Sequence, residues 1–451
     1  MIEVGFEVTV LAMKRIPFFL LFPVFAGLSA EPALQKAVKA RVAGSYEKLF
    51  ELYKHLHSHP EISFQEEKTG LRLGAEMREL GFAVTQKVGG HGVVCVFKNG
   101  KGPTVLVRAD TDALPVLEAT GLSYASKQKT TDERGVEVPT MHACGHDVHM
   151  TCWVGAARVL TALKDKWSGT LVFIAQPAEE RGAGAKAMLA EGLFEKYPVP
   201  DYCLALHVSH DQPAGTLGYT SGFAMANVDS VDITVRGTGG HGSQPQSAKD
   251  PIVLAAKIIL DLQTIVSREI HPLEPAVVTV GSIHGGTKHN IIPDDVHLQL
   301  TLRSYSSKVR LHLIDSIKRI CLGQAQAAGV PKGRMPVVKV KDEFTPATYN
   351  DPALVKRVNG VFAEWFGKDV LIERKPTMGG EDFGRYGTTR HKIPIYMFRL
   401  GSISPAVVQR ARATGKPLPS LHSSIFAPDP EPTITTGVTA MSAAVLDLLM
   451  R

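Results

Sequence analysis

Residues 104–108 read Thr-Val-Leu-Val-Arg and residues 171–175 read Leu-Val-Phe-Ile-Ala. Short, almost wholly apolar runs of this kind are typical of strands that are buried on both faces of a parallel sheet. Segments with helical apolar spacing lie near 148–164 and 183–190, so strands and helices alternate along the chain. The pattern predicts an α/β domain with a mostly parallel, mixed sheet flanked by helices.

The pattern changes near residue 225. Beyond it the strands alternate apolar and polar residues, and amphipathic helices accompany them. The clearest strands lie at 231–236 and 297–303, and the helices lie near 251–267 and 307–327. This mixture predicts an α+β unit that differs from the α/β part of the chain.

An apolar run of the earlier kind returns at 393–398. The α+β unit is therefore expected to be an insertion over 225–343. The surrounding catalytic domain would consist of 31–224 and 344–451. A chain of 451 residues is long enough for two domains.

The composition is that of a folded globular protein. Hydrophobic residues make up 44% of the chain and charged residues 21%, which excludes a disordered, collagenous or coiled-coil protein. The 50 basic and 44 acidic residues leave a net charge of +6, spread thinly over the chain. Nucleic acid is therefore a poor candidate for a partner.

The cysteines are too few and too scattered for a disulfide framework or a zinc ribbon. There are five, with no Cys-x-x-Cys spacing, at positions 95, 144, 152, 203 and 321. Any cysteine chemistry should therefore come from a single site.

The first residues are typical of a secretory signal peptide. A basic pair at 14–15 precedes an apolar run at 16–26 that is too short to span a bilayer, and Ala26 or Ala30 offers a cleavage point. We expect a signal peptide over 1–30, with Met13 as an alternative start. No other run looks able to cross a membrane, so the mature protein is expected to be soluble and either periplasmic or secreted. An uncleaved anchor is the alternative interpretation.

Residues 141–149 contain the densest cluster of metal-type ligands, Met-His-Ala-Cys-Gly-His-Asp-Val-His. Cys144 and His146 are two positions apart on a loop loosened by Gly145, so both side chains can turn toward one ion. A polar loop whose side chains are satisfied by hydrogen bonds would explain the cluster equally well.

A second cluster follows the apolar run at 171–175, where Glu179 and Glu180 are delivered to the end of a strand. Open α/β sheets bind ligands at that edge. Because adjacent side chains point in different directions, one carboxylate can bind a metal while the other carries a proton. A solvated acidic turn is the simpler alternative, and His207 and His422 are each unremarkable alone.

Together, the ordered motifs resemble those of the amidohydrolase family that includes hippurate hydrolases, N-acyl-amino-acid amidohydrolases and plant auxin-conjugate hydrolases. That family is related to dinuclear-metal aminoacylases and carboxypeptidases. The resemblance extends from about His57 to the C-terminus. It rests on Arg-Ala-Asp-Thr-Asp-Ala-Leu-Pro at 108–115, the cluster at 141–149, Gln-Pro-Ala-Glu-Glu at 176–180, Leu206-His207, Gly-Gly-Glu-Asp-Phe at 379–383 and Leu-His-Ser at 421–423.

The resemblance implies two divalent metal ions, and the ligand types are compatible with zinc, manganese, cobalt or nickel. The positions that match the family's ligands are Cys144, His146, Glu180, His207 and His422. Cys144 would bridge the ions, with His146 and His207 on one and Glu180 and His422 on the other. Asp110 and Asp112 would support the ligands from behind, although a plain strand-end turn is an alternative.

The resemblance also implies the reaction. Glu179 matches the general base, which would take a proton from a water activated by the metals and pass it to the leaving amine. The expected substrate is a small N-acyl or N-aroyl amino acid. A dipeptide or a C-terminal peptide bond is the alternative for the same site.

Further positions match residues that contact substrate in related enzymes. His241 lies in Gly-Gly-His-Gly-Ser at 239–243 and would stabilise the oxyanion, often across a homodimer formed by the inserted domain. Asn290 and Arg303 match residues that hold the substrate's carboxylate or carbonyl, and Gly379 could let the backbone approach the substrate. A surface loop and a structural ion pair are the alternatives.

Two other classes of function remain open at this point. Cys144 could be the nucleophile of a metal-free thiol amidase, with His146 or His142 as its base. The protein could also be an exported metal- or ligand-binding protein without turnover. The thiol hypothesis leaves Glu180, His207 and His422 unexplained, and the binding hypothesis leaves the base unexplained.

Overall fold

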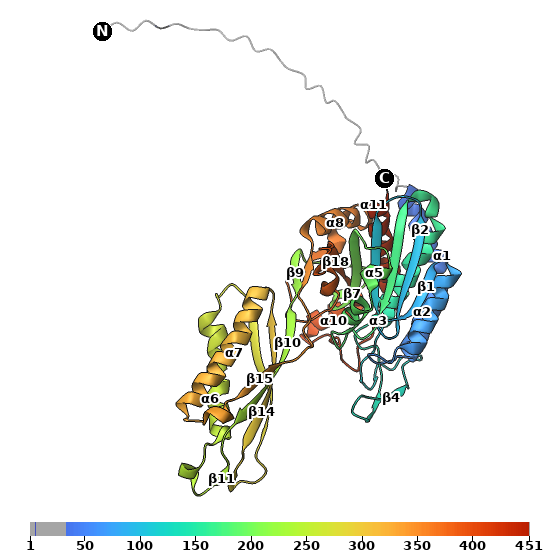
Figure 1. Ribbon diagram of the computed structural model, residues 1–451. Helices are drawn as coiled ribbons and strands as arrows, with labels where there is room; N and C mark the ends of the chain where they lie inside the picture. The colour runs from blue at the N-terminus through green and yellow to red at the C-terminus, as the bar shows by residue number, and fades with distance from the viewer. Residues whose placement is uncertain (1–4, 6–32, 451) are drawn as a thin grey trace.

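The computed structural model describes Gly5 and residues 33–450, and it shows two bodies (Figure 1). The predicted signal peptide at 1–30 therefore lies outside the described residues, apart from Gly5. The larger body carries the beginning of the described chain and its C-terminal end, and the smaller body projects from it.

A mixed sheet of eight strands forms the centre of the larger body. Its strands are β1 Ala83–Val88, β2 Gly92–Asn99, β3 Thr104–Asp110, β6 Gly169–Gln176, β7 Tyr202–Pro213, β8 Leu217–Tyr219, β17 Leu371–Glu373 and β18 Ile395–Ile403. They lie in the order β1-β2-β6-β3-β7-β18-β8-β17. The central strands β6, β3, β7 and β18 are parallel to their neighbours within that group, and the β1–β2–β6 side is antiparallel. The predicted fold class is confirmed.

Both faces of this sheet are buried, which explains the apolar runs. In β3, Val105 and Val107 point into one core, and Leu106 points into the core on the other face. Because successive residues of a strand face opposite sides, a strand covered on both sides must be apolar at every position. The runs at 104–108 and 171–175 fall in β3 and β6, which pair in register.

Helices cover both faces. The helices of the first core are α1 Ala33–Ser58, α2 Glu67–Glu79, α3 His146–Ala162, α8 Pro352–Phe366 and α11 Pro430–Leu449. The second core receives the short helices α4 Gly184–Ala190, α5 Leu193–Lys196 and α9 Gly384–Gly387. The helix α10 Pro405–Thr414 adds Val408 to the first core. Outside these layers lies the hairpin of β4 Lys129–Thr131 and β5 Glu137–Pro139.

The helix α11 is long and apolar enough to cross a membrane, contrary to our expectation that no run beyond the signal segment could do so. In the fold, 78% of its apolar window is buried, and the helix packs against α1 and α3. Its hydropathy is therefore explained by its place in the core.

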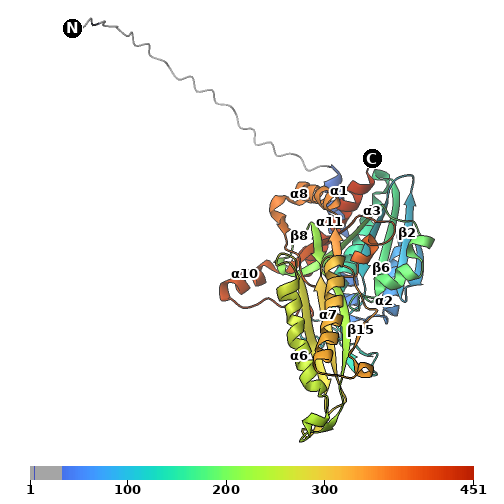
Figure 2. The same ribbon diagram turned by 60° about the vertical axis from the view of Figure 1, so that its left-hand side comes forward.

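The smaller body has its own antiparallel sheet and its own core. Its strands are β10 Asn227–Arg236, β12 Ala276–Gly285, β14 Asp295–Ser304 and β15 Val337–Val340, in the order β12-β14-β10-β15. The helices α6 Pro251–Thr264 and α7 Ser307–Ala327 lie side by side on one face (Figure 2). Burial alternates along β10 as expected for a sheet that is covered on one side only.

The two passages of the chain between the bodies lie side by side. The strand β9 Gly222–Met225 leads out of the larger body and pairs with β16 Thr348–Asn350, which leads back. At the other end of the smaller body, β11 Gly240–His241 pairs with β13 Ile291–Ile292 (Figure 1). All fully buried residues of the smaller core lie between Val231 and Val330.

His57, near the end of α1, ties three segments of the larger body together. It is 1% exposed and lies 2.7 Å from the Asp147 carboxylate through Nδ1 and 2.9 Å from Glu118 through Nε2. Burial lowers the pKa of His57, but the hydrogen bonds to Asp147 and Glu118 outweigh it and raise the pKa to about 9. The imidazolium thus donates one hydrogen bond to α3 and one to the loop after β3.

This contact predicts a pH dependence of stability. Because the pKa of His57 is raised above its ordinary value, its stabilisation is complete below about pH 6.5 and is lost as the pH rises through about 9. We expect up to about 3 kcal/mol of the unfolding free energy to be lost over that window. Urea unfolding at several pH values should show a flatter profile for His57→Gln than for the wild type. Parallel profiles would contradict the assignment.

Candidate active site

The predicted site residues converge on the carboxyl ends of the parallel strands. Asp110 ends β3, Gln176 ends β6 just before the two glutamates, and His207 lies within β7 between the middle strands. The first turn of α3 begins at His146 on the same side. Strand ends that are far apart in sequence thus meet at one edge, where α/β sheets bind ligands.

Gly145 permits the turn that presents Cys144 and His146. Its φ is +77°, a conformation that favours glycine, and it caps the N-terminus of α3. A Cβ at this position would lie 2.6 Å from Val208 Cγ2, so the approach of this turn to β7 also requires glycine.

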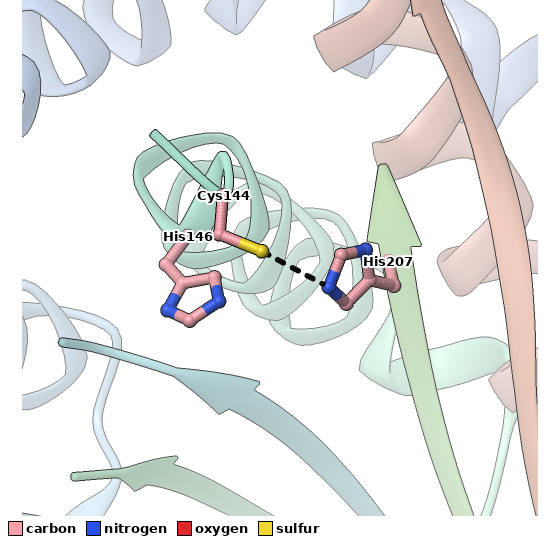
Figure 3. Close-up of side chains that lie close together, drawn as sticks. All are labelled: Cys144, His146 and His207. Atoms are coloured by element: carbon pink, nitrogen blue, oxygen red, sulfur yellow. Dashed lines mark hydrogen bonds between the residues drawn. The ribbon is translucent and has the colours of Figure 1, made fainter. Parts of the chain in front are cut away.

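All five predicted metal ligands come together as two groups of three. In the first, Cys144 and His146 face His207, and the Cys144 Sγ lies 3.6 Å from His207 Nε2 (Figure 3). In the second, Cys144 joins Glu180 and His422, whose Oε1 and Nε2 are 3.4 Å apart. The ligand atoms of each group lie within 4.8 Å of one another. Cys144 is common to both groups, as a bridging thiolate requires.

Hydrogen bonds to the backbone fix the tautomers of two histidines. The Nδ1 of His146 donates to the carbonyl of Asp112 at 2.7 Å, and the Nδ1 of His207 donates to the carbonyl of Val208 at 2.8 Å. Both rings therefore present the Nε2 lone pair to the site. Burial, and then the charge of Arg399, lower the pKa of His207 well below its usual range, which keeps this ring in the neutral form that binds metals.

Two buried polar atoms of the site have no hydrogen-bond partner among the described residues, His146 Nε2 and Glu180 Oε1. Buried polar atoms are nearly always satisfied, and these two point into the ligand cluster. Imidazole, carboxylate and thiolate donors around one point suit a divalent transition metal. The residues present therefore fit a dinuclear metal centre.

Asp112 holds the glutamate turn in place. Its two carboxylate oxygens accept the backbone N–H groups of Glu179 and Glu180, each at 3.0 Å, and one also accepts the Ser63 hydroxyl at 2.6 Å. Its own carbonyl orients His146. The expectation that Asp112 supports the ligands agrees with these contacts.

Asp110 supports the site from the other side. It accepts hydrogen bonds from His149 Nδ1 at 2.6 Å and from Arg108 Nη1 at 2.7 Å. His149 Nε2 accepts the N–H of Val208 at 2.9 Å, so both of its ring nitrogens are occupied. His149 is therefore a support for the site and no ligand, although it lies in the same motif as His146.

Arg108 is the centre of a fully buried charge network that sequence reasoning missed. Besides Asp110, its guanidinium contacts Glu381 at 2.9 Å and Asp382 at 3.2 Å. The sequence offered one signal, because Glu381 and Asp382 belong to one of the motifs that carry the family resemblance. That motif did not indicate what the two residues do. The network joins the end of β3 to the segment that follows Gly379 and Gly380.

The backbone is strained at two points of the site. Ala178, just before the glutamates, has a φ of +50°, and His422 has a φ of +65°. Ala178 donates its N–H to the buried carboxylate of Glu66 at 2.7 Å, and His422 donates its N–H to the Ala143 carbonyl at 2.9 Å. Such conformations persist where surrounding contacts hold them, and they concentrate at functional sites.

Glu179 has the environment of a proton carrier. It is nearly buried, and its Oε2 lies 3.9 Å from His146 Nε2. Burial first, and then the neighbouring Glu381 and Glu180, raise the pKa of Glu179 well above its usual range. A carboxyl with a raised pKa can accept and release a proton near neutral pH.

The thiol-amidase hypothesis finds no support in the environment of Cys144. Burial, and then Glu180, raise the pKa of its thiol, whereas a nucleophilic cysteine needs a lowered one. The proposed base His142 has no hydrogen-bond partner among the described residues, and burial lowers its pKa to about 4.

A cavity of about 770 Å³ opens over the ligand cluster. Its walls include Cys144, Glu179 and His422 from the larger body and Arg303 from β14 of the smaller one. Gly379 also lines it. Two of the three predicted substrate-binding residues, Arg303 and Gly379, are therefore beside the predicted catalytic glutamate.

His241 and Asn290 are not brought to this cavity. Both are exposed on the β11–β13 ribbon, where the Gly242 N–H donates to the Asn290 carbonyl at 2.8 Å. Neither residue lines the cavity. Their predicted roles are therefore not explained by the contacts of a single chain.

Comparison with known proteins agrees with this geometry. Residues 106–413 match Peptidase family M20/M25/M40. Hippurate hydrolase of Campylobacter jejuni is 38% identical over 342 residues, 74% of this chain and 84% of that protein. Thermostable carboxypeptidase 1 of Saccharolobus solfataricus is 36% identical over 358 residues, 78% of this chain and 86% of that protein.

Among solved structures, a dinuclear metal binding peptidase of the M20 family from Bacillus subtilis is similar, with a TM-score of 0.72 at 28% identity. The match covers 90% of this chain and 100% of that one. The family resemblance inferred from the sequence motifs is confirmed.

The contacts of Asp112 predict its effect on metal binding. In Asp112→Ala the N–H groups of Glu179 and Glu180 lose their acceptor, so the turn that carries the ligand Glu180 should loosen. Loss of such a supporting contact typically costs about 10- to 100-fold in metal affinity. Competition with a chromogenic chelator measures this, with the exposed Asp342→Ala as the control. Unchanged affinity in a folded Asp112→Ala protein would contradict the assigned role.

Proposed function

The chain belongs to Peptidase family M20/M25/M40, and we propose that it hydrolyses the amide bond of N-acyl or N-aroyl amino acids. Members of this family are metal-dependent hydrolases of amide bonds, and this chain is such an enzyme. The observation that supports the proposal is that Glu179 lies beside two groups of side chains that could each hold a metal ion, in the wall of an open cavity.

In the proposed centre, His146 and His207 would hold one divalent ion, Glu180 and His422 the other, and Cys144 both. Bound metal would polarise the amide carbonyl and lower the pKa of the attacking water. A set of imidazole, carboxylate and thiolate ligands is compatible with zinc, manganese, cobalt or nickel, and metal availability can override affinity.

Glu179 would carry the proton through the reaction. It takes a proton from the attacking water as the new C–O bond forms, and it gives that proton to the amide nitrogen as the C–N bond breaks. The products are a carboxylic acid and a free amino acid. The raised pKa of Glu179 suits the second step, because the protonated carboxyl has to persist until the amine leaves.

Arg303 is the proposed binding residue for the substrate's α-carboxylate. It lines the cavity from β14, and its Nε donates to the Thr301 hydroxyl at 3.1 Å, which steadies the guanidinium. A planar guanidinium pairs with a carboxylate through two parallel hydrogen bonds. Gly379 has no side chain, so it exposes its backbone to the same cavity as Arg303.

We further propose that the enzyme is a homodimer. His241 would stabilise the oxyanion and Asn290 would contact the substrate in the partner's cavity, because neither reaches the cavity of its own chain. The β11–β13 ribbon that carries them is exposed at the end of the smaller body, where a second subunit could dock.

The amino-acid sequence also supports export. The basic pair, the short apolar run and the small residues within 1–30 suit a cleaved signal peptide, so the proposed location is periplasmic or extracellular.

Peptides are the second candidate substrate class. The similarity to a protein named carboxypeptidase favours it, at nearly the same identity as the similarity to hippurate hydrolase. Both reactions use the same metals and the same base, and they differ only in what occupies the acyl side of the cavity.

Removal and return of metal should switch the activity off and on. Hippurate, N-acetyl-amino acids, indoleacetyl-amino acids and dipeptides would be assayed after chelation and again with zinc, manganese, cobalt or nickel. We expect release of free amino acid only with metal. Activity that survives chelation would contradict the metal mechanism, and stoichiometric metal binding without turnover would indicate a binding protein.

Glu179→Gln should separate metal binding from chemistry. The variant keeps the shape of the side chain but removes its proton transfer, so kcat should fall by about 100-fold or more. Metal content measured by mass spectrometry should stay near two ions per chain, whereas the ligand variant Glu180→Gln should lose metal. Retention of most turnover in Glu179→Gln would refute its role.

Complementation between subunits tests the role of His241. His241→Ala should lower kcat by about 100-fold or more, because it removes an oxyanion donor. Mixing it with Glu179→Gln under exchange conditions creates heterodimers in which one of the two cavities is intact. Activity should return to about one quarter of the wild-type value at full statistical exchange. Absence of any recovery in verified heterodimers would contradict a site shared between subunits.

A further inference from the structure

Arg399 lines the cavity, and the proposed reaction does not include a contact between Arg399 and the substrate. It lies on β18, directly opposite His207 of the parallel neighbour β7. Its Nη2 donates to the Met225 sulfur at 2.8 Å. A thioether is a weak acceptor, so this contact satisfies little of a guanidinium's charge.

Arg108 is a structural arginine of the same domain, and its surroundings differ from those of Arg399. Arg108 is buried and contacts three carboxylates. Among the described residues, no carboxylate lies within ion-pair distance of Arg399, and Glu381, the sulfur of Cys144 and Glu179 act on it only from farther away. Taking a cation out of water without a counter-charge is costly. A bound anion would supply the missing charge.

Most other basic groups around the cavity are already engaged. Arg374 pairs with Asp211, and Arg181 pairs with Glu133. Arg303 resembles Arg399, since its one hydrogen bond is to the hydroxyl of Thr301. The cavity therefore has two guanidinium groups that lack a carboxylate partner, one from each body of the chain.

Both groups lie near the glycine pair that begins the resembling motif at 379–383. A Cβ at Gly380 would lie 3.4 Å from Arg303 Nη1. A Cβ at Gly379 would lie 3.3 Å from the methyl carbon of Met225, whose sulfur contacts Arg399. The two cations thus lie near the same glycine pair in the wall of one cavity. A single extended ligand could meet both.

We propose that Arg399 forms a second anion subsite and that the substrate is an N-acyl amino acid with two carboxylates. This inference rests on the proposed function. Arg303 would bind the α-carboxylate and Arg399 the second one, through the bidentate pairing that a planar guanidinium favours. The second carboxylate can belong to the amino-acid side chain, as in glutamate, or to the far end of the acyl group, as in succinate.

Matched substrate pairs test the subsite and distinguish the two sources. The metal-loaded enzyme would be assayed with N-acetylglutamate against N-acetylglutamine, and with N-succinylalanine against the corresponding succinamide. In at least one pair we expect the dicarboxylate to have a kcat/KM about tenfold or more above that of its amide. The preferred pair identifies where the second carboxylate lies.

Arg399→Met removes the charge at similar length. It should lower kcat/KM for the preferred dicarboxylate by about 10- to 100-fold more than it lowers kcat/KM for the amide, mainly through KM. Arg399→Lys should recover part of the preference. Lys375→Met, an exposed cation on the rim of the same cavity, controls for long-range attraction and should change the preference little.

The results would overturn the proposal in two ways. Either the wild type shows no preference in both pairs, or Arg399→Met slows dicarboxylate and amide equally, which would indicate a structural role. If no N-acyl amino acid is hydrolysed with any metal, the proposed function fails on its own. Calorimetric binding of glutarate against glutaramate to the metal-loaded wild type and Arg399→Met would then decide the subsite separately, and equal binding would refute it.

Discussion

The candidate site depends on the hydrogen bonds that the carboxylate of Asp112 accepts. By accepting the N–H groups of Glu179 and Glu180 together, it fixes a turn in which one glutamate joins the ligand cluster and the other stands beside it. The carbonyl of the same residue sets the tautomer of His146. One residue thus positions the proposed base and two of the candidate ligands, because the neighbouring strands β3 and β6 end at the same edge of the sheet.

Buried charge is the second constraint, since acidic groups that serve a metal centre repel one another before the metal binds. The fold offsets this with Arg108, whose guanidinium lies among Asp110, Glu381 and Asp382. The pKa of Asp382 still rises to about 7, chiefly through burial. Arg399 and Arg303 are different, because they face the cavity with no such partner and leave room for an anionic ligand.

Much of the fold could be predicted from the spacing of apolar residues along the chain. The runs at 104–108 and 171–175 became β3 and β6 because both faces of the sheet are covered, and the alternating segment at 231–236 became part of β10 because only one face is covered there. The candidate ligands were predicted from the order of the motifs, through the family resemblance. Arg399 was missed because its significance depends on the pairing of β18 with β7, which brings together residues 399 and 207.

The sequence by itself determined the fold class, the family and the set of residues that can bind metal, since these depend on local pattern and motif order. Only the tertiary structure decided what each side chain can do. The motif at 141–149 contains three histidines. His146 keeps a free Nε2, whereas His149 loses its lone pair to the N–H of Val208. That difference arises from contacts across the sheet, and metal binding depends on the direction of a lone pair, which no spacing along the chain specifies.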